Sequence, residues 1–151
     1  MRSNRFEIFS TSILQLIRAV QQMKAQKMAQ YDLKSTNALC LCQLLESGEG
    51  LSAAELSRQG EIDKAQVSRC MAELTARGFV YRNDQDGRRY KQKYCLTAEG
   101  EAVATDVASE LGKIQDAVQK DLTPEELSAF FDTLAQLCRN FEELLDEKKQ
   151  A

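Results

Sequence analysis

The sequence predicts a mainly helical fold with one small β-hairpin, and three observations lead to that prediction. Apolar residues recur three or four positions apart over most of the chain, which is the spacing of one face of an α-helix. The period changes to two only between about residues 79 and 96, as expected for two short strands. Residues that cap helices stand before most of the periodic segments. With 151 residues, 43% of them hydrophobic and 28% charged, the chain can bury the core of one domain.

Two helices are predicted first. A long amphipathic helix is expected over about residues 6–30, because its apolar residues form one stripe, namely Phe6, Phe9, Ile13, Ile17 and Val20. The second helix is predicted from Ser35, whose hydroxyl can cap it, to about Ser47. Gly48 and Gly50 then end this helix in a tight turn.

A short third helix is predicted to begin after Ser52. The Ser52 hydroxyl can accept a hydrogen bond from an unpaired backbone amide, and Glu55 completes a capping box three residues later. The helix is expected to run to about Gln59 and to be closed by Gly60.

The fourth predicted helix follows after a very short connection. Asp63 is its N-cap, and Gln66 stands at the reciprocal position of a capping box. Its inward face is marked by three apolar residues spaced four and three apart, Val67, Met71 and Leu74. The helix is expected to reach Gly78. Two short helices joined by a tight turn form the pattern of a helix-turn-helix.

A hairpin is predicted next. Residues 79–83 read as one strand, residues 84–87 as a polar turn and residues 88–96 as the returning strand. Because the hairpin directly follows the helix-turn-helix and has a charged tip, the segment has the organisation of a winged helix-turn-helix.

Two further helices close the chain. Thr97 with Gly100 opens a long helix with an apolar stripe at Val103, Val107, Leu111, Ile114 and Val118. Thr123 caps the last helix, with the chain's one proline, Pro124, at its first position and Glu126 at the reciprocal place. That helix is apolar on more than one side, at Leu127, Phe130, Phe131, Leu134, Leu137, Cys138, Phe141, Leu144 and Leu145. A large apolar surface of this kind usually marks an interface, although each phenylalanine taken singly would also suit the core of a monomer.

Charge is unevenly distributed along the chain, whose formal net charge is −3. Residues 1–57 carry +1 and residues 94–151 carry −8, whereas residues 58–93 carry nine basic groups against five acidic ones, a net +4. The basic groups are Arg58, Lys64, Arg69, Arg77, Arg82, Arg88, Arg89, Lys91 and Lys93. A solvated face without a partner would account for this count as well as a nucleic-acid site would.

Composition also excludes several classes of protein. The absence of histidine removes a Ser-His-Asp triad and a His-ligated zinc site, and no nucleophile-base pair, metal cluster or phosphate-binding glycine loop stands in their place. We therefore expect no enzyme, cofactor or metal. Five irregularly spaced cysteines predict reduced thiols, and the lack of a signal peptide or an 18-residue apolar run predicts a cytoplasmic protein.

The fourth helix is the candidate base-reading element. If Val67, Met71 and Leu74 face the core, the opposite side carries Lys64, Ala65, Gln66, Ser68 and Arg69. Glutamine can bond adenine with both ends of its amide, arginine can do the same to guanine, and alanine permits close approach. Gln66 and Arg69 are therefore the predicted base-reading residues.

The hairpin is the candidate wing. It offers basic groups to phosphates and, at its tip, to a narrow minor groove, whose negative potential attracts arginine. These groups are Arg82, Arg88, Arg89, Lys91 and Lys93. Asp86 can hold the Arg88 side chain extended.

These residues together resemble the MarR family of transcription regulators. The resemblance rests on Gln66-Val67-Ser68-Arg69, Leu74, Gly78-Phe79-Val80, Arg82, Asp86 to Arg88, and Leu96-Thr97-Ala98-Glu99-Gly100. It places Gln66 and Arg69 on the recognition helix and Arg88 at the wing arginine. Seven residues separate Arg88 from Leu96, about two more than this family leads us to expect, so Arg89 stays open as the wing-tip residue.

The resemblance implies one MarR-type domain over residues 1–151. About residues 35–97 would form the winged helix-turn-helix, and about residues 6–30 and 98–147 the long dimerisation helices. The implied function is a homodimeric regulator, most simply a repressor, that binds double-stranded DNA at a palindromic operator and is released by a small-molecule effector or a modification. Met23, Met28, Tyr31 and Phe79 could line an effector cavity, although each suits a plain core position better.

Two other functions stay open. The acidic net charge allows a winged-helix module that binds protein instead of DNA. Five thiols allow a redox sensor, although Cys40 and Cys42 point about 200° apart on one helix and would not form a bridge without distorting it. Modification of Cys70 or Cys95 could disturb DNA binding, and Cys138 is expected at the dimer interface.

Overall fold

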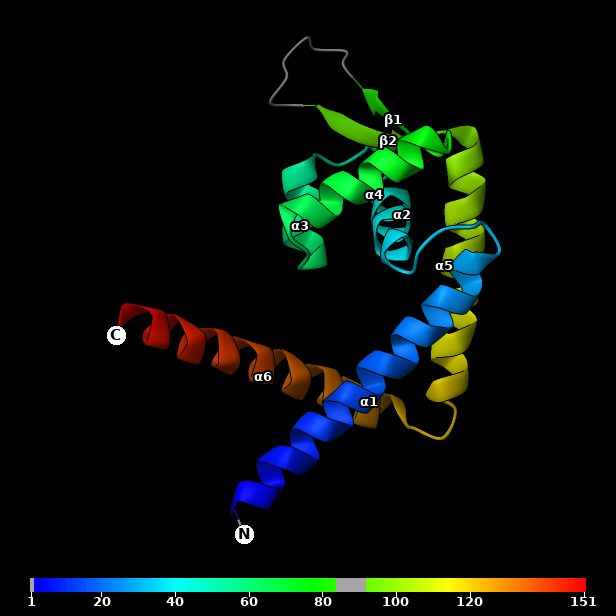
Figure 1. Ribbon diagram of the computed structural model, residues 1–151. Coiled ribbons are helices and arrows are strands. Elements are labelled where there is room, and N and C mark those ends of the chain that lie inside the picture. The colour runs from blue at the N-terminus through cyan, green and yellow to red at the C-terminus, as the bar shows by residue number, and fades with distance from the viewer. Residues whose placement is uncertain (1, 84–91) are drawn as a thin grey trace. The chain divides into compact units, whose positions relative to one another are not determined.

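The structure is a computed structural model that describes residues 2–83 and 92–151. Within them the elements follow the predicted order (Figure 1): α1 (Arg2–Ala29), α2 (Thr36–Ser47), α3 (Ala53–Gly60), α4 (Lys64–Ala76), β1 (Val80–Asn83), β2 (Lys93–Leu96), α5 (Ala98–Val118) and α6 (Pro124–Gln150). The expectation of a mainly helical fold with a small β wing is confirmed. The chain divides into two compact units, residues 1–111 and 112–151. Among the described residues, no helix is at once long enough and apolar enough to cross a membrane.

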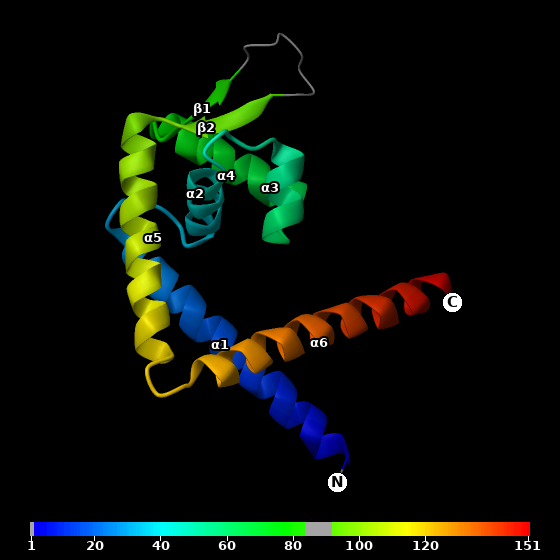
Figure 2. The same cartoon turned by 180° about the vertical axis from the view of Figure 1, so that it is seen from behind.

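The core of the first unit lies where α2, α3 and α4 meet beneath the two strands (Figure 2). The predicted inward face of α4 is confirmed, because Val67 and Leu74 are 0% exposed and Met71 1%. Each fully buried side chain of this size contributes about 1.5–3 kcal/mol through removal of apolar surface from water. These contacts fix the rotation of α4 about its own axis.

Helix capping follows the sequence at α3 and α4. The Ser52 side chain accepts from the Glu55 amide at 3.1 Å, and Glu55 accepts from the Ser52 amide at 2.8 Å, so the predicted capping box is confirmed. Asp63 caps α4 by accepting from the Gln66 amide at 2.7 Å. Both helix starts are therefore held by side chains that the sequence identifies.

Three predictions about helix ends were wrong. Ser35 does not cap α2 with its side chain, because it already has helical dihedrals (φ −54°, ψ −33°) within the turn that leads into the helix. Gly60 is the last residue of α3, and Glu61 adopts the left-handed conformation (φ 53°) that ends it. At α4 the cap is one-sided, since the Gln66 amide group bonds side chains of its own helix instead of reaching back to Asp63.

The two strands form an antiparallel pair in which Val80 faces Leu96 and Asn83 faces Lys93. β2 is also tied to the turn before α3, because Leu51 and Tyr94 exchange backbone hydrogen bonds of 3.0 and 2.8 Å. A residue larger than glycine cannot occupy position 50, where a Cβ would lie 2.6 Å from the Cys95 sulfur and φ is +91°. The strands are thus anchored directly to the helix-turn-helix.

The start of α5 packs closely against the hairpin. The Thr97 hydroxyl donates to the Gly78 carbonyl at 2.6 Å and accepts from the Gly100 amide at 3.0 Å. A Cβ at Gly100 would lie 1.8 Å from the Phe79 carbonyl oxygen, so only glycine permits this approach. The predicted helix start at Thr97 and Gly100 is confirmed.

The end of α1 is joined to α4 and α5. The Arg77 guanidinium donates to the carbonyls of Tyr31 and Asp32 at 2.6 and 3.0 Å. Lys27, only 9% exposed, pairs with Asp106 at 2.7 Å, and the Tyr31 hydroxyl donates to the same carboxylate. This hydrogen bond raises the pKa of Tyr31.

The first half of α1 and the length of α6 expose many of their apolar residues. On α1, Phe6, Leu16 and Ile17 are more than half exposed. In the second unit, α6 begins with the predicted capping box of Thr123 and Glu126 but contains no buried residue. Its exposed apolar side chains are Phe130, Phe131, Phe141, Leu144 and Leu145.

Candidate nucleic-acid interface

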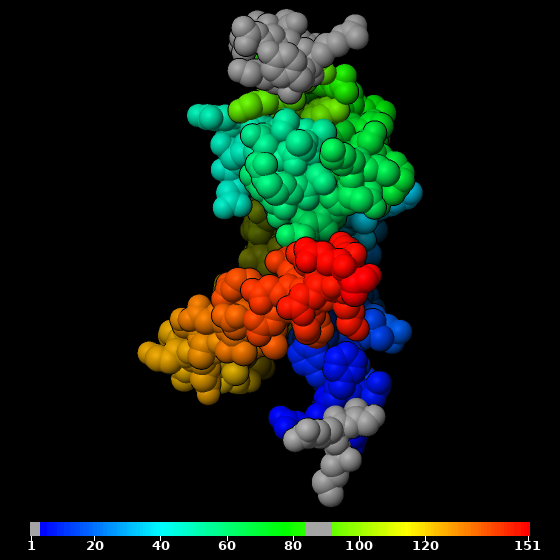
Figure 3. Space-filling model, turned by 90° about the vertical axis from the view of Figure 1, so that its left-hand side faces the viewer, coloured from blue at the N-terminus to red at the C-terminus, as the bar shows by residue number. Residues whose placement is uncertain are grey.

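The outer face of α4 carries the predicted recognition residues. Lys64, Ala65, Ser68 and Arg69 are exposed, and Gln66 is half-buried. They lie there because the Asp63 cap and the buried face together fix the rotation of the helix. In the space-filling view, α3 and α4 (turquoise and green) form one continuous surface (Figure 3). The polar and basic groups of α4 are thus available on the outside of the molecule.

Gln66 and Arg69 form a pair on this surface. The Arg69 Nη2 atom donates to Gln66 Oε1 at 3.0 Å, and Gln66 Nε2 donates to the sulfur of Cys70 at 3.9 Å. Both ends of the Gln66 amide are occupied, so reading a base with Gln66 requires these weak contacts to be exchanged for contacts with the base.

Arg82 lies on β1 and packs against the opposite strand. Its guanidinium carbon lies 5.3 Å from the centre of the Tyr94 ring, and its Nη2 atom donates to the Tyr94 hydroxyl at 2.9 Å. A hollow of about 510 Å³ connects this pair with Ser68 and Thr75 on α4. The described part of the hairpin therefore places one guanidinium beside the outer face of α4.

The remaining wing candidates, Asp86, Arg88 and Arg89, lie outside the described residues, as do the predicted turn at residues 84–87 and the first residues of the returning strand. Whether Arg88 or Arg89 is the wing-tip residue stays open. Arg77, a basic residue of the same segment, has a structural role. Its guanidinium donates to the carbonyls of Tyr31 and Asp32 and so stabilises the turn after α1.

Sequence reasoning missed a polar seam between α2 and α4. Asn37, 0% exposed, donates from Nδ2 to Glu73 Oε2 at 2.9 Å. Two buried thiols lie on the same two helices, Cys40 on α2 and Cys70 on α4. Nothing local in the sequence signals the Asn37–Glu73 pair, because its members are 36 positions apart.

The five cysteines differ in how far they are exposed. All five are free thiols, and Cys40 is buried. Cys42 is half-buried, which raises the pKa of its thiol. Cys138 is exposed in the single chain, so its expected place in a dimer interface stays a prediction.

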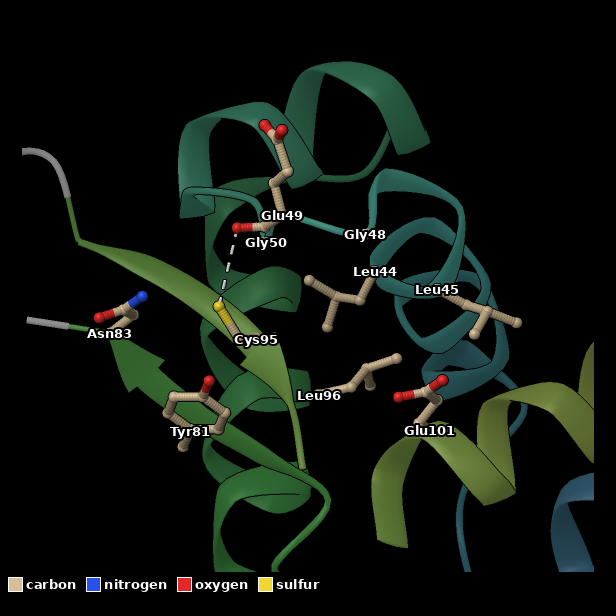
Figure 4. A pocket seen from close by; sticks show the side chains of 10 residues that line it. All are labelled: Leu44, Leu45, Gly48, Glu49, Gly50, Tyr81, Asn83, Cys95, Leu96 and Glu101. Carbon is tan, nitrogen blue, oxygen red and sulfur yellow. Dashed lines mark hydrogen bonds between the residues drawn. The ribbon is translucent and has the colours of Figure 1, made fainter. Parts of the chain in front are cut away.

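The residues considered for an effector cavity lie in the core, against it, or partly exposed on α1. Met28 is fully buried in the core, Tyr31 and Phe79 pack against it, and Met23 is 38% exposed. A separate hollow of about 360 Å³ lies among the end of α2, the two strands and the start of α5 (Figure 4). There the Cys95 sulfur is directed at the Glu49 carbonyl, 3.8 Å away.

Comparison with known proteins bears on this architecture. Residues 31–89 match the model of the MarR family. Among curated proteins, none matches the sequence. Solved structures do match. Their sequence identities to this chain are low, so the match shows a shared fold.

Three of these structures illustrate the likeness. A MarR family regulator from Neisseria meningitidis has a TM-score of 0.80 at 19% identity, over 95% of this chain and 98% of that one. A MarR family regulator from Listeria monocytogenes, complexed with a 26mer DNA, has a TM-score of 0.80 at 18% identity, over 92% and 93%. The MepR–DNA complex from S. aureus has a TM-score of 0.78 at 19% identity, over 88% and 96%. The chain therefore has the fold of the MarR family transcription regulators, and its residues 31–89 carry that family's sequence pattern.

Proposed function

We propose that this protein is a homodimeric, sequence-specific DNA-binding transcription regulator that acts as a repressor at a palindromic operator. The recognition helix is α4, with Gln66 and Arg69 as the base-reading residues and Lys64, Ala65 and Ser68 beside them. The hairpin is the wing, with Arg82 and, at its tip, Asp86, Arg88 and Arg89.

The observation that carries this proposal is the division of α4 into two faces. Val67, Met71 and Leu74 are buried, whereas Lys64 and Arg69 are exposed. A helix held by its apolar face and presenting glutamine and arginine outward has the chemistry to bond base edges in a major groove. The Listeria monocytogenes and S. aureus structures of this fold both contain DNA, which gives the proposal a precedent.

Dimerisation is supported by the exposed apolar surface of the terminal helices. The exposed residues of α6 and of the first half of α1 are too many and too large for an ordinary solvated helix. A second copy would cover them in a two-fold symmetric interface, and would supply a second recognition helix for the other half of a palindrome.

Release from DNA would follow binding of a small-molecule effector or modification of the protein. An effector that binds the DNA-free conformation better shifts the population toward it by the ratio of its affinities for the two conformations.

Electrophoretic mobility shift with the DNA upstream of the protein's own coding region tests the proposal. We expect a discrete complex whose affinity falls steeply as salt rises, because phosphate contacts release counterions. Absence of binding to any palindrome at low salt, or binding that ignores salt, would instead favour a winged-helix module that binds protein.

A further inference from the structure

One tyrosine of the hairpin, Tyr94, lies between the core of the helix-turn-helix and a basic side chain. It is half-buried on β2 and packs against the buried core residues. Its backbone is held on both sides, because it stands opposite Arg82 in the register of the two strands and exchanges hydrogen bonds of 2.8 and 3.0 Å with Leu51. The position of the Tyr94 ring is thus tied to the turn before α3 as well as to β1.

The basic side chain is that of Arg82, which is exposed on β1. Its Nη2 and Nε atoms both donate to the Tyr94 hydroxyl, at 2.9 and 3.3 Å, and its guanidinium carbon lies 5.3 Å from the centre of the ring. Long side chains that stand directly opposite each other in an antiparallel pair are close enough to make such contacts. Because ordering a long side chain costs conformational entropy, contact with Tyr94 restricts Arg82 before any DNA binds.

The Arg82–Tyr94 pair lies on the side of the hairpin that faces the recognition helix. Both residues line the hollow of about 510 Å³ that Ser68 and Thr75 of α4 also line. A guanidinium carries five N–H donors, so one that is bonded to a tyrosine hydroxyl can still donate to a phosphate. When a recognition helix occupies a major groove, the phosphates that border the groove pass beside the helix, which is where this guanidinium lies.

We propose that Tyr94 is a positioning residue for DNA binding, which holds the Arg82 guanidinium beside α4 so that it donates to a backbone phosphate of the operator. The inference rests on the proposed function, since it names the residue that orders one of its phosphate contacts. It adds an uncharged side chain to the residues on which DNA affinity depends.

The same hairpin contains a matched control. Tyr81 is next to Arg82 on β1 and is 47% exposed. Because side chains alternate between the two faces of a strand, Tyr81 lies on the face away from the Arg82–Tyr94 pair. It lines the other hollow together with Asn83 and Cys95 (Figure 4). Loss of its hydroxyl should therefore leave Arg82 unaffected.

The first test compares Tyr94→Phe with Tyr81→Phe in the full-length protein. Fluorescence anisotropy measures the affinity for a duplex that the wild type binds and for a second duplex with altered bases. Tyr94→Phe should raise the dissociation constant about threefold to tenfold on both duplexes, because it removes the hydroxyl that accepts from Arg82. Tyr81→Phe should stay within about twofold of the wild type. An effect of Tyr94→Phe on the preferred duplex alone would indicate base reading and overturn the proposal.

The second test is a double-mutant cycle with Arg82→Ala. If Tyr94 acts through Arg82, Tyr94→Phe should have no further effect on affinity in the Arg82→Ala protein. The salt slope should fall by about 1 in Arg82→Ala, with Tyr94→Phe between that variant and the wild type. A Tyr94→Phe effect of the same size with and without Arg82 would show that the tyrosine acts independently, which contradicts a positioning role.

Urea denaturation without DNA distinguishes positioning from a loss of folded protein. Tyr94→Phe should unfold at nearly the wild-type midpoint, so that its weaker binding reflects the bound state alone. Arg82 is exposed, so Arg82→Ala is expected to fold whatever Tyr94→Phe does, and wild-type affinity of Arg82→Ala would overturn the proposal by itself. Failure of the wild type to bind any duplex refutes the proposed function, and this inference with it.

Discussion

The winged-helix region and the terminal helices differ in how they bury their apolar residues. Between α2 and β2, the apolar side chains that repeat at helical spacing are enclosed, as Val67 and Leu74 are at 0% exposure. On α6 equally regular apolar residues are open to water, with Leu145 at 57% exposure. The same kind of sequence pattern thus occurs on a helix with a buried apolar face and on a helix with an exposed one.

An amphipathic helix can therefore have one of two roles, which are to complete the core of its own chain or to bind a second surface. The winged-helix region completes its own core, so its outer face is left free to be polar and basic. The terminal helices have apolar surface that the single chain does not cover, which is costly in water and calls for a second surface. We infer that the first region determines what the protein recognises and that the terminal helices determine how many copies act together.

The largest effect is expected from substitutions that place charges on the exposed apolar surface of α6. Phe131→Asp combined with Leu145→Asp should convert a dimer to a monomer in sedimentation experiments. Each of the two side chains would be buried twice in a symmetric interface, so the loss is about 6 kcal/mol or more per dimer.

Gln136→Glu is the matched control, because it adds a charge to α6 at an exposed polar position that bonds only Asn140 and Arg139. It should leave the dimer intact. A doubly substituted protein that sediments as the wild type does would show that these side chains are not in an interface.

A substitution on the buried face of α4 should destabilise the winged-helix region. Met71→Ala is expected to lower the free energy of unfolding by about 2–5 kcal/mol, because the side chain is 1% exposed and leaves a cavity. Ser68→Ala on the exposed face of the same helix should change it by about 0.5 kcal/mol or less. Denaturation with urea measures both, and equal effects would disprove the assignment of the two faces.

The outer face of α4 and the hairpin should affect DNA binding differently. Arg69→Ala is expected to cost about 1–3 kcal/mol at the preferred site and to relax sequence preference. Arg82→Ala should weaken binding to all sequences alike and lower the salt slope by about 1, if it contacts phosphate. Fluorescence anisotropy on matched and altered duplexes distinguishes these outcomes, and loss of discrimination in Arg82→Ala would reverse the assignment.

The smallest effect concerns the capping box of α3. Glu55 accepts the Ser52 amide hydrogen bond, which lowers the pKa of its carboxyl. The stabilisation is therefore complete above the unfolded pKa of about 4.3 and is lost as the pH falls through the lower folded value.

Glu55→Gln should cost about 0.3–1 kcal/mol at neutral pH, and the gap to the wild type should close as the pH falls below about 4. Thermal unfolding across this range measures the gap, and a gap that widens in acid would have the wrong sign.

The sequence predicted those features of the fold that depend on residues near one another. Helical spacing identified the buried face of α4, and the pairs Ser52–Glu55 and Thr123–Glu126 identified two helix starts, because a cap requires only residues three apart. The exposed positions of Lys64 and Arg69 follow from the same periodicity.

Features that depend on distant contacts could not be predicted in this way. The Asn37–Glu73 hydrogen bond and the hydrogen bonds of Arg77 to Tyr31 and Asp32 join segments that meet only after folding. The left-handed Glu61 was missed because glycine is the usual residue in that conformation, and Gly60 stands next to it.

Selection of bound sequences from random duplex DNA tests the central claim most directly, since it reports on binding, symmetry and spacing together. We predict enrichment of an inverted repeat whose half-sites lie about 10 base pairs apart, centre to centre, and loss of the enriched bases when Arg69 is replaced by alanine. No enrichment, or enrichment of a single unrepeated motif, would contradict the account.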